Sequence, residues 1–288
     1  MLNRKPGLVV AAAFVLVVFL VSEVPQSYAV TGLNISVAPN RLAVSVGLSD
    51  TLAAVGATSS FNWAGYAVSK ASGTVTAAQG SWIQPATTCN SAATGVQYAA
   101  FWVGIDGYSS TTVEQTGTLS ICPPGSSTPQ YIAWYEFYPA QPIEQILTVI
   151  IHAGDKIQAI VKYSATKKTI TVTLKDVTDG QSYSTANPSG FTFLRSSAEC
   201  ITETPSTGTG LALLANFGSV SWGKDYTNVK NTCSATVSGS TKPIGNFGAS
   251  SVDIAMCIYP SCTTVMAMPS SISKDGTSFK VAFENAGP

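Results

Sequence analysis

Short runs of alternating apolar and polar residues constrain the fold of this chain more than any other feature of its sequence. Residues 169–174 alternate threonine with aliphatic side chains, and the same period of two recurs at 157–161 and 279–283. Successive side chains of a β-strand point to opposite faces, so each run predicts a strand. Turn-forming pairs such as Asp179-Gly180 separate the runs. The pattern predicts an all-β fold, an antiparallel sandwich or barrel.

The N-terminal region predicts export from the cell. Arg4 and Lys5 precede an uninterrupted apolar stretch at 7–21, and the small residues Ser27 and Ala29 suit a signal peptidase. A membrane span needs roughly 20 apolar residues, more than this stretch provides. We therefore expect a signal peptide at 1–29, with an uncleaved signal anchor as the alternative. The expected product is secreted and extracellular, with no membrane association after signal cleavage.

Residues 30–58 differ from the remainder of the exported chain. They lack aromatic side chains, whereas a dense aromatic pattern begins at Phe61. This change predicts a prosegment or N-terminal extension at 30–58, with an extra edge strand as the alternative. Residues 59–288 are expected to form the β-sandwich domain.

Charge and cysteine content exclude several classes of function. Only 10% of the residues are charged, and 15 basic residues balance 15 acidic ones. Nucleic-acid binding needs a concentrated positive face, so no nucleic-acid partner is expected. Six cysteines in an exported chain predict disulfides, and Cys257 and Cys262 are close enough to close a hairpin. No pair of cysteines has the spacing and the histidine of a zinc site, so no metal is expected.

Elimination leaves carboxylates and amides as the available catalytic groups. The chain has one histidine, His152, which directly follows an apolar run and is expected to be an ordinary residue at a strand end. The sequence contains no nucleophile elbow, no phosphate-binding glycine loop and no zinc-protease motif. No cofactor is therefore expected.

Four segments carry aromatic, acidic and amide side chains in a distinctive order. They read FWVGIDG at 101–107, VEQTG at 113–117, AWYEFYP at 133–139 and AECITE at 198–203. Together with NWAGYA at 62–67, ANFG at 215–218 and GTSFKV at 276–281, they resemble the glutamic peptidases, or eqolisins. The resemblance covers nearly the whole chain from about residue 61. It implies a lectin-like sandwich of two antiparallel sheets and an acid endopeptidase activity that is insensitive to pepstatin.

The resemblance also implies roles for individual residues. The catalytic glutamine falls on Gln115, and the catalytic glutamate falls on Glu203, the last residue of its segment, rather than on Glu199. The residues expected around the substrate cleft are Trp102, Asp106, Trp134 and Glu136.

A glutamine and a glutamate together suit peptide hydrolysis in acid. An unperturbed glutamate has a pKa of about 4.3, so it can take and return a proton at acidic pH. An amide does not titrate, so it remains a donor to the charge that develops on the carbonyl oxygen. Glu203 is thus expected to act as base and then acid, with Gln115 at the oxyanion. The expected partners are polypeptide substrates, and the expected state is a monomer.

Two other classes of function remain open from the residues alone. A carbohydrate-binding or glycoside-hydrolysing sandwich could use Glu136 and Glu203, because glycosidases need two carboxylates roughly 5–10 Å apart. Such an enzyme has no need of Gln115, which distinguishes it from a peptidase. A catalytically silent surface or matrix protein is the third alternative.

Overall fold

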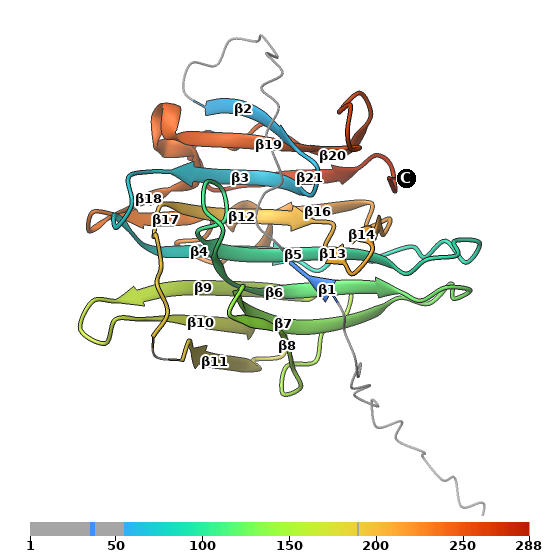
Figure 1. The fold of residues 1–288 in the computed structure, drawn as a ribbon, viewed down its shortest axis with the longest axis horizontal. Helices are drawn as coiled ribbons and strands as arrows, with labels where there is room; N and C mark the ends of the chain where they lie inside the picture. Colours follow the sequence, from blue (N-terminus) through green and yellow to red (C-terminus); the bar gives the residue numbers. More distant parts are fainter. Residues whose placement is uncertain (1–34, 38–54, 189, 288) are drawn as a thin grey trace, which may run out of the picture.

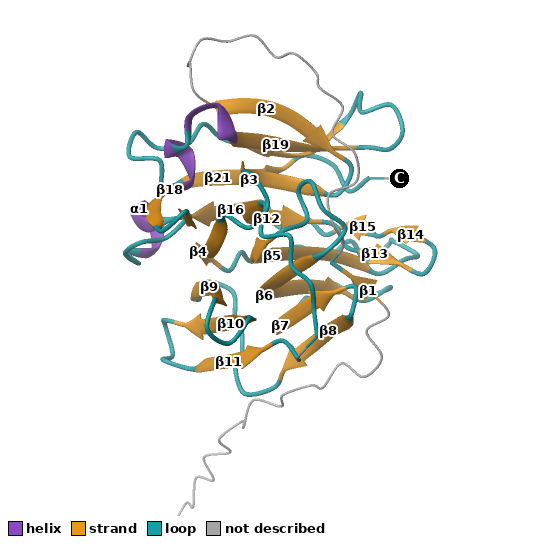
Figure 2. Cartoon of the chain, turned by 60° about the vertical axis from the view of Figure 1, so that its left-hand side comes forward, coloured by secondary structure: helices purple, strands orange, loops and turns teal. Residues whose placement is uncertain are grey.

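The computed structural model describes residues 35–37, 55–188 and 190–287, which are mostly β-strands joined by turns (Figures 1 and 2). Helical structure in this part is confined to α1 (Lys224–Thr227) and two 3-10 turns, Ile244–Asn246 and Gly248–Ser250. Among the described residues, no helix combines the length and the apolarity needed to cross a membrane.

The first of two large sheets carries most of the motifs from the sequence. Its neighbouring strands run antiparallel, except for the parallel pair formed by the first two strands at one edge. In spatial order the strands are β2 (Val55–Ser60), β19 (Ser251–Cys257), β3 (Trp63–Ser69), β12 (Ser197–Glu203), β5 (Gln97–Ile105), β6 (Val113–Cys122), β7 (Gln130–Tyr138) and β8 (Gln141–Ile146).

The second sheet packs against one face of the first and is joined to it through the pairing of β19 with β20. Its main strands in order are β20 (Val265–Pro269), β21 (Phe279–Phe283), β16 (Ser219–Trp222), β4 (Val75–Ile83), β9 (Lys156–Ser164), β10 (Thr169–Asp176) and β11 (Ser182–Ala186). The hairpin of β17 (Ser234–Val237) and β18 (Ser240–Pro243) pairs with the start of β4. The short β15 (Leu213–Leu214) runs parallel to the start of β5.

A third, small sheet lies beside the first. It consists of β1 (Ile35–Ser36), β13 (Ser206–Thr207) and β14 (Gly210–Leu211), all antiparallel. β13 follows β12 directly along the chain, so this small sheet begins where a strand of the first sheet ends.

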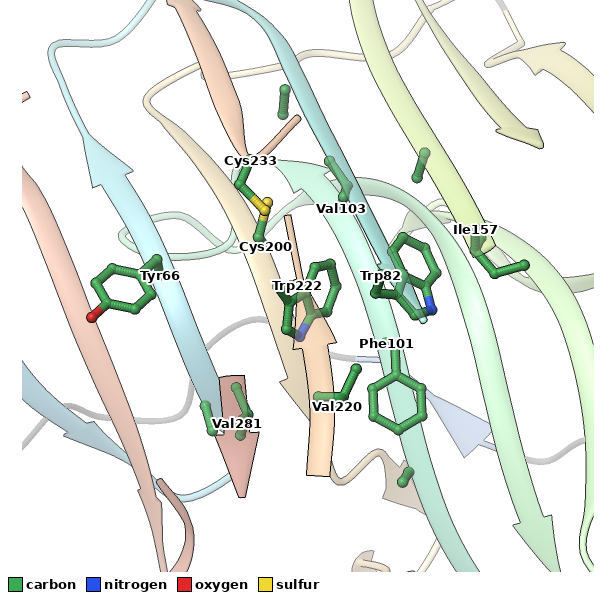
Figure 3. Packing of buried hydrophobic residues seen from close by; sticks show 14 of the residues in the cluster. Tyr66, Trp82, Phe101, Val103, Ile157, Cys200, Val220, Trp222, Cys233 and Val281 are labelled. Atoms are coloured by element: carbon green, nitrogen blue, oxygen red, sulfur yellow. The ribbon is translucent and has the colours of Figure 1, made fainter. Parts of the chain in front are cut away.

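Alternation along the strands creates two apolar layers. Phe101 and Val103 of β5 face the second sheet and join the main core, which contains Trp82 and Trp222 (Figure 3). Trp102 points the opposite way, into a second cluster on the outer face of the first sheet. β5 is therefore buried on both faces, and this outer cluster contains the candidate site described below.

The structure confirms the sandwich of two antiparallel sheets that the sequence predicted. The alternating runs at 157–161, 169–174 and 279–283 form β9, β10 and β21. Residues 1–34, with the expected signal peptide, lie outside the described residues. So do residues 38–54 of the expected extension, but β2 begins at Val55 and pairs with β19. The sandwich therefore starts before residue 59.

The cysteines form two of the predicted disulfides. Cys89 is bonded to Cys122, and Cys257 is bonded to Cys262, as the short spacing of the second pair suggested. Cys200 and Cys233 are buried thiols, and their sulfur atoms meet in the main core (Figure 3). Burial raises the pKa of the Cys200 thiol well above its usual value, and the neighbouring Cys233 reinforces the shift.

Candidate active site

The pairing register of the first sheet aligns the motif residues in rows across its outer face. In one row, Trp102 of β5 pairs with Ile201 of β12 and with Gly117 of β6, which in turn pairs with Trp134 of β7. The next row on this face lies two residues along each strand, because side chains alternate. Its central residue is Gly104 of β5.

Gln115 and Glu199 flank Gly104 in this second row. Gly104 pairs with Gln115 on one side and with Glu199 on the other. Two strand spacings put the backbones of Gln115 and Glu199 about 10 Å apart. A Cβ atom on Gly104 would lie only 2.8 Å from the Trp102 ring and 3.2 Å from the Val113 side chain. The missing Cβ thus makes room for the Trp102 indole above β5.

Hydrogen bonds fix the direction of the Gln115 amide. The side-chain Nε2 donates to Oε2 of Glu136 at 3.0 Å and to the backbone oxygen of Val37 at 2.6 Å. Glu136 extends this row, because it pairs with Gln115 across β6 and β7. All three residues are almost completely buried. The amide nitrogen is therefore directed at a peptide carbonyl group.

Burial shifts the pKa values of the carboxyl groups in this row. Burial raises the pKa of Glu136 to about 8, against the opposing effect of hydrogen bonds from Gln115 and Ser36. Burial also raises the pKa of Glu199 well above its usual value, and the carboxylates of Asp106 and Glu114 reinforce the shift. The side chain of Ser197 opposes this shift in the pKa of Glu199. Both groups therefore hold their protons to a higher pH than a free glutamate.

Glu203 occupies a different place. It pairs with Ala100 of β5, four residues along β12 from Glu199 and therefore about 13 Å away along the strand. Its Oε2 accepts a hydrogen bond from Nε1 of Trp102 at 2.9 Å, and its Oε1 accepts one from Nδ2 of Asn62 at 3.2 Å. These contacts make Glu203 an anchor for the Trp102 indole. The assignment of Gln115 and Glu203 to catalysis stays a prediction.

The remaining predicted site residues have distinct positions. Trp102, Trp134 and Glu136 share the outer face with Gln115, and their role in a substrate cleft stays a prediction. Asp106 follows β5 with a left-handed backbone, at φ 72°. Its carboxylate accepts hydrogen bonds from the backbone N–H groups of Arg195 and Ser196 and from the Ser196 hydroxyl. Asp106 therefore holds the start of β12 in place.

Two contributors escaped the prediction from sequence. Asn62, in the NWAGYA segment, bonds Glu203 and packs within the same buried network, and Gly104 separates the two polar side chains of the central row. Both residues lie in the motif segments, so the motifs indicated the region of the site but not the roles of these two residues. His152 lies outside this row, on the turn before β9 of the second sheet. Its Nδ1 is 3.5 Å from the Asp155 carboxylate.

Comparisons with known proteins identify the family of the chain. The model of the Peptidase A4 family matches residues 61–259. A search of curated protein sequences finds no match.

Among solved structures, scytalido-glutamic peptidase with a transition state analog inhibitor is 22% identical. It has a TM-score of 0.60, and the match covers 77% of this chain and 98% of that one. An eqolisin in complex with a tripeptide is 23% identical with a TM-score of 0.58, covering 77% and 98%. Aspergilloglutamic peptidase from Aspergillus niger is 28% identical with a TM-score of 0.53, covering 65% and 99%.

The family match spans most of the described sandwich and includes all four motif segments. The fold and the order of the motifs agree with it. The chain belongs to the Peptidase A4 family, the glutamic peptidases or eqolisins, and is a peptide-bond hydrolase.

Proposed function

We propose that the chain is a secreted endopeptidase that cleaves polypeptides in acid with Gln115 and Glu203. The observation that carries this proposal is the direction of the Gln115 amide, which donates a 2.6 Å hydrogen bond to a peptide oxygen, that of Val37. Glu203 lies on the same outer face of the first sheet, where its carboxyl group accepts a hydrogen bond from Trp102. The expected signal peptide, the disulfides and the low charge support an extracellular setting.

In the first step the Glu203 carboxylate takes a proton from the attacking water, and the oxygen of that water bonds to the carbonyl carbon. The Gln115 amide N–H donates to the carbonyl oxygen as negative charge develops there. Glu203 then returns the proton to the leaving amine as the C–N bond breaks. The products are a carboxylic acid and an amine, and Glu203 ends in its original ionised form.

The environment of Gln115 suits the role of oxyanion donor. Its Oε1 has no hydrogen-bond partner among the described residues, whereas its Nε2 is directed by Glu136. A glutamine side chain cannot lose this donor in acid. Glu136 holds its proton to about pH 8, so it remains a neutral group beside the developing charge.

Glu203 is the base in this proposal, because Glu199 holds its proton in acid. Burial raises the pKa of Glu199 well above its usual value, so its carboxyl group is protonated at acidic pH and takes no proton from water. The carboxyl group of Glu203 accepts hydrogen bonds from Trp102 and Asn62, which hold it on the outer face. Glu199 is the alternative base, and substitution separates the two.

The test is cleavage of an acid-denatured protein by the Gln115→Ala variant. Loss of one oxyanion donor should lower kcat by about 10²–10³-fold. The Gln158→Ala variant is the matched control, because Gln158 lies on β9 of the second sheet. Pepstatin should leave wild-type cleavage unchanged, because the proposed pair differs from two carboxylates that share a proton. Near-normal cleavage by Gln115→Ala would contradict the proposal.

A further inference from the structure

A small cavity opens to solvent at one end of the sandwich. It has a volume of about 340 Å³ and lies between the start of β6, the end of β7 and the part of the chain that follows β11. Its lining includes Thr112, Glu114, Tyr138, Phe191 and Thr192. Thr192 is exposed, whereas Glu114 is only 2% exposed. The cavity therefore leads from the surface to a buried carboxyl group.

The Glu114 side chain points away from the candidate active site. Side chains alternate along β6, so Gln115 faces outward and Glu114 faces the second sheet. The residues that pair with Glu114, Ile105 and Phe137, both belong to the main core between the sheets. Oε2 of Glu114 finds no hydrogen-bond partner on another described residue. The cavity thus has a wall with an acceptor that the fold leaves unused.

The charges around Glu114 favour a positively charged ligand. Burial raises the pKa of Glu114 well above its usual value, the Asp106 carboxylate reinforces the shift, and the backbone of Glu114 itself opposes it. Within the described ranges of the chain, the one ion pair joins His152 and Asp155, so no lysine or arginine compensates this carboxyl group. An opposite charge close to a buried carboxylate stabilises its ionised form. A cation in the cavity would supply that charge.

The other lining residues suit an organic cation. Tyr138 and Phe191 offer aromatic rings, and the face of such a ring attracts an ammonium group. The buried Oγ1 of Thr112 finds no hydrogen-bond partner among the described residues, which provides a second oxygen. An ammonium group carries three N–H donors and can bond both oxygens.

A metal ion fits this cavity less well. Hard cations such as Ca²⁺ need six or more oxygen ligands around them. In the part of the chain that the structure describes, the one group of acidic, histidine or cysteine side chains close enough to hold a metal consists of His152, Asp155 and Asp179. None of these three residues lines the cavity.

We propose that this cavity binds a primary ammonium group on a short apolar stem. The Glu114 carboxyl group and the Thr112 hydroxyl accept hydrogen bonds from the ammonium group, and Tyr138 and Phe191 enclose the stem. A free alkylamine and a lysine side chain of a polypeptide both present this chemistry. The site goes beyond the proposed peptidase function and does not rest on it, because Glu114 and Gln115 lie on opposite faces of β6.

The first experiment titrates the full wild-type chain at pH 7 with n-butylammonium and, separately, with n-butanol, while calorimetry records the heat of binding. The amine is charged at this pH, because alkylammonium groups such as that of lysine have a pKa of about 10.4. A ligand this small should bind with a Kd on the order of millimolar. We expect n-butanol to bind at least about tenfold more weakly, because it lacks the charge. Equal binding of the two probes, or no saturable binding of n-butylammonium, overturns the proposal.

The second experiment repeats the titration with the Glu114→Gln variant, which keeps the size of the side chain and removes its charge. Hydrogen bonds to charged groups are the stronger class, so n-butylammonium should bind about tenfold to a hundredfold more weakly. Glu144→Gln is the matched control, because Glu144 is exposed on β8, and it should bind as wild type does. Equal binding by wild type and Glu114→Gln overturns the proposal. If Glu114→Gln does not fold, the comparison of the two probes on wild type decides.

A third titration distinguishes the sources of the ammonium group. The probe is a lysine with an acetyl group on its amino end and a methylamide on its carboxyl end. Binding at least as tight as that of n-butylammonium assigns the site to lysine side chains of polypeptides, and binding more than about tenfold weaker assigns it to free amines. Both results uphold the ammonium site. All three titrations measure binding alone, so their failure leaves the peptidase proposal standing.

Discussion

Gln115 and Glu199 are paired with opposite sides of one glycine, Gly104, on the outer face of the first sheet. They are far apart in sequence, and the register of three strands alone brings them into line. The arrangement requires β6, β5 and β12 to be adjacent and Gly104 to leave room for the Trp102 ring above β5.

Replacing Gly104 with alanine should damage the site. The added Cβ would meet the Trp102 ring at 2.8 Å and the Val113 side chain at 3.2 Å, so the indole would have to move. Overpacking of this kind costs about 1–3 kcal/mol of stability. Urea unfolding should show that loss, together with reduced peptidase activity. Gly56→Ala is the control, because its new Cβ would have ordinary contacts beginning at 3.8 Å.

The stability of the fold should fall as pH rises above the usual pKa of a glutamate. Glu114, Glu136 and Glu199 all have pKa values raised by burial. The folded state therefore binds protons more tightly than the unfolded state, and stability declines between the unfolded and folded pKa values, up to about pH 8 for Glu136. Thermal unfolding across this window measures the decline.

A glutamine in place of Glu199 should flatten this dependence on pH, because an amide has no proton to lose. The exposed Glu144 offers the matched variant, Glu144→Gln, which should leave the slope as in wild type. If Glu199→Gln and wild type lose stability equally over the same pH range, the carboxyl group of Glu199 is not the buried acid described here.

Removing the carboxyl group of Glu203 should release Trp102. Glu203→Ala leaves the Trp102 and Asn62 donors without the oxygens that accept from them, at a cost of about 1–3 kcal/mol. Glu203→Gln keeps an oxygen acceptor and should lose less. Chemical denaturation of the two variants measures the difference, and an unchanged midpoint for Glu203→Ala would contradict the anchoring role.

The two unbonded cysteines should react only after unfolding. Cys200 and Cys233 are buried in the main core, and a thiol with a raised pKa supplies little thiolate at neutral pH. A thiol reagent should modify neither in the folded protein and both in denaturant. Failure to modify either in denaturant would show that the pair is oxidised to a third disulfide.

Much of the fold could be predicted from local sequence patterns. The alternation of apolar and polar residues and the turn-forming pairs depend only on residues that are neighbours along the chain. The alternating runs became β9, β10 and β21. Register between distant strands leaves no such local signature. The two glutamates of AECITE, Glu199 and Glu203, point to the same face, and only their partners on β5, Gly104 and Ala100, distinguish them.

The contacts of residues 35–37 could not be predicted from the sequence for a related reason. Their composition suggested an extension, but the contact between the Val37 carbonyl and Gln115 joins positions that no motif connects. Asp106 illustrates the same limit. Its place in the IDG segment suggested the cleft, whereas its hydrogen bonds hold the backbone of 195–196.

The central claim is that Glu203 is the base that works with Gln115, and the most direct measurement is kcat/KM for Glu203→Gln beside Glu199→Gln at acidic pH. Loss of a general base lowers the rate by about 10²–10⁴-fold. We expect that loss for Glu203→Gln and a much smaller one for Glu199→Gln, with both variants folded by circular dichroism. Near-normal turnover by Glu203→Gln, with turnover abolished in Glu199→Gln, would contradict the account.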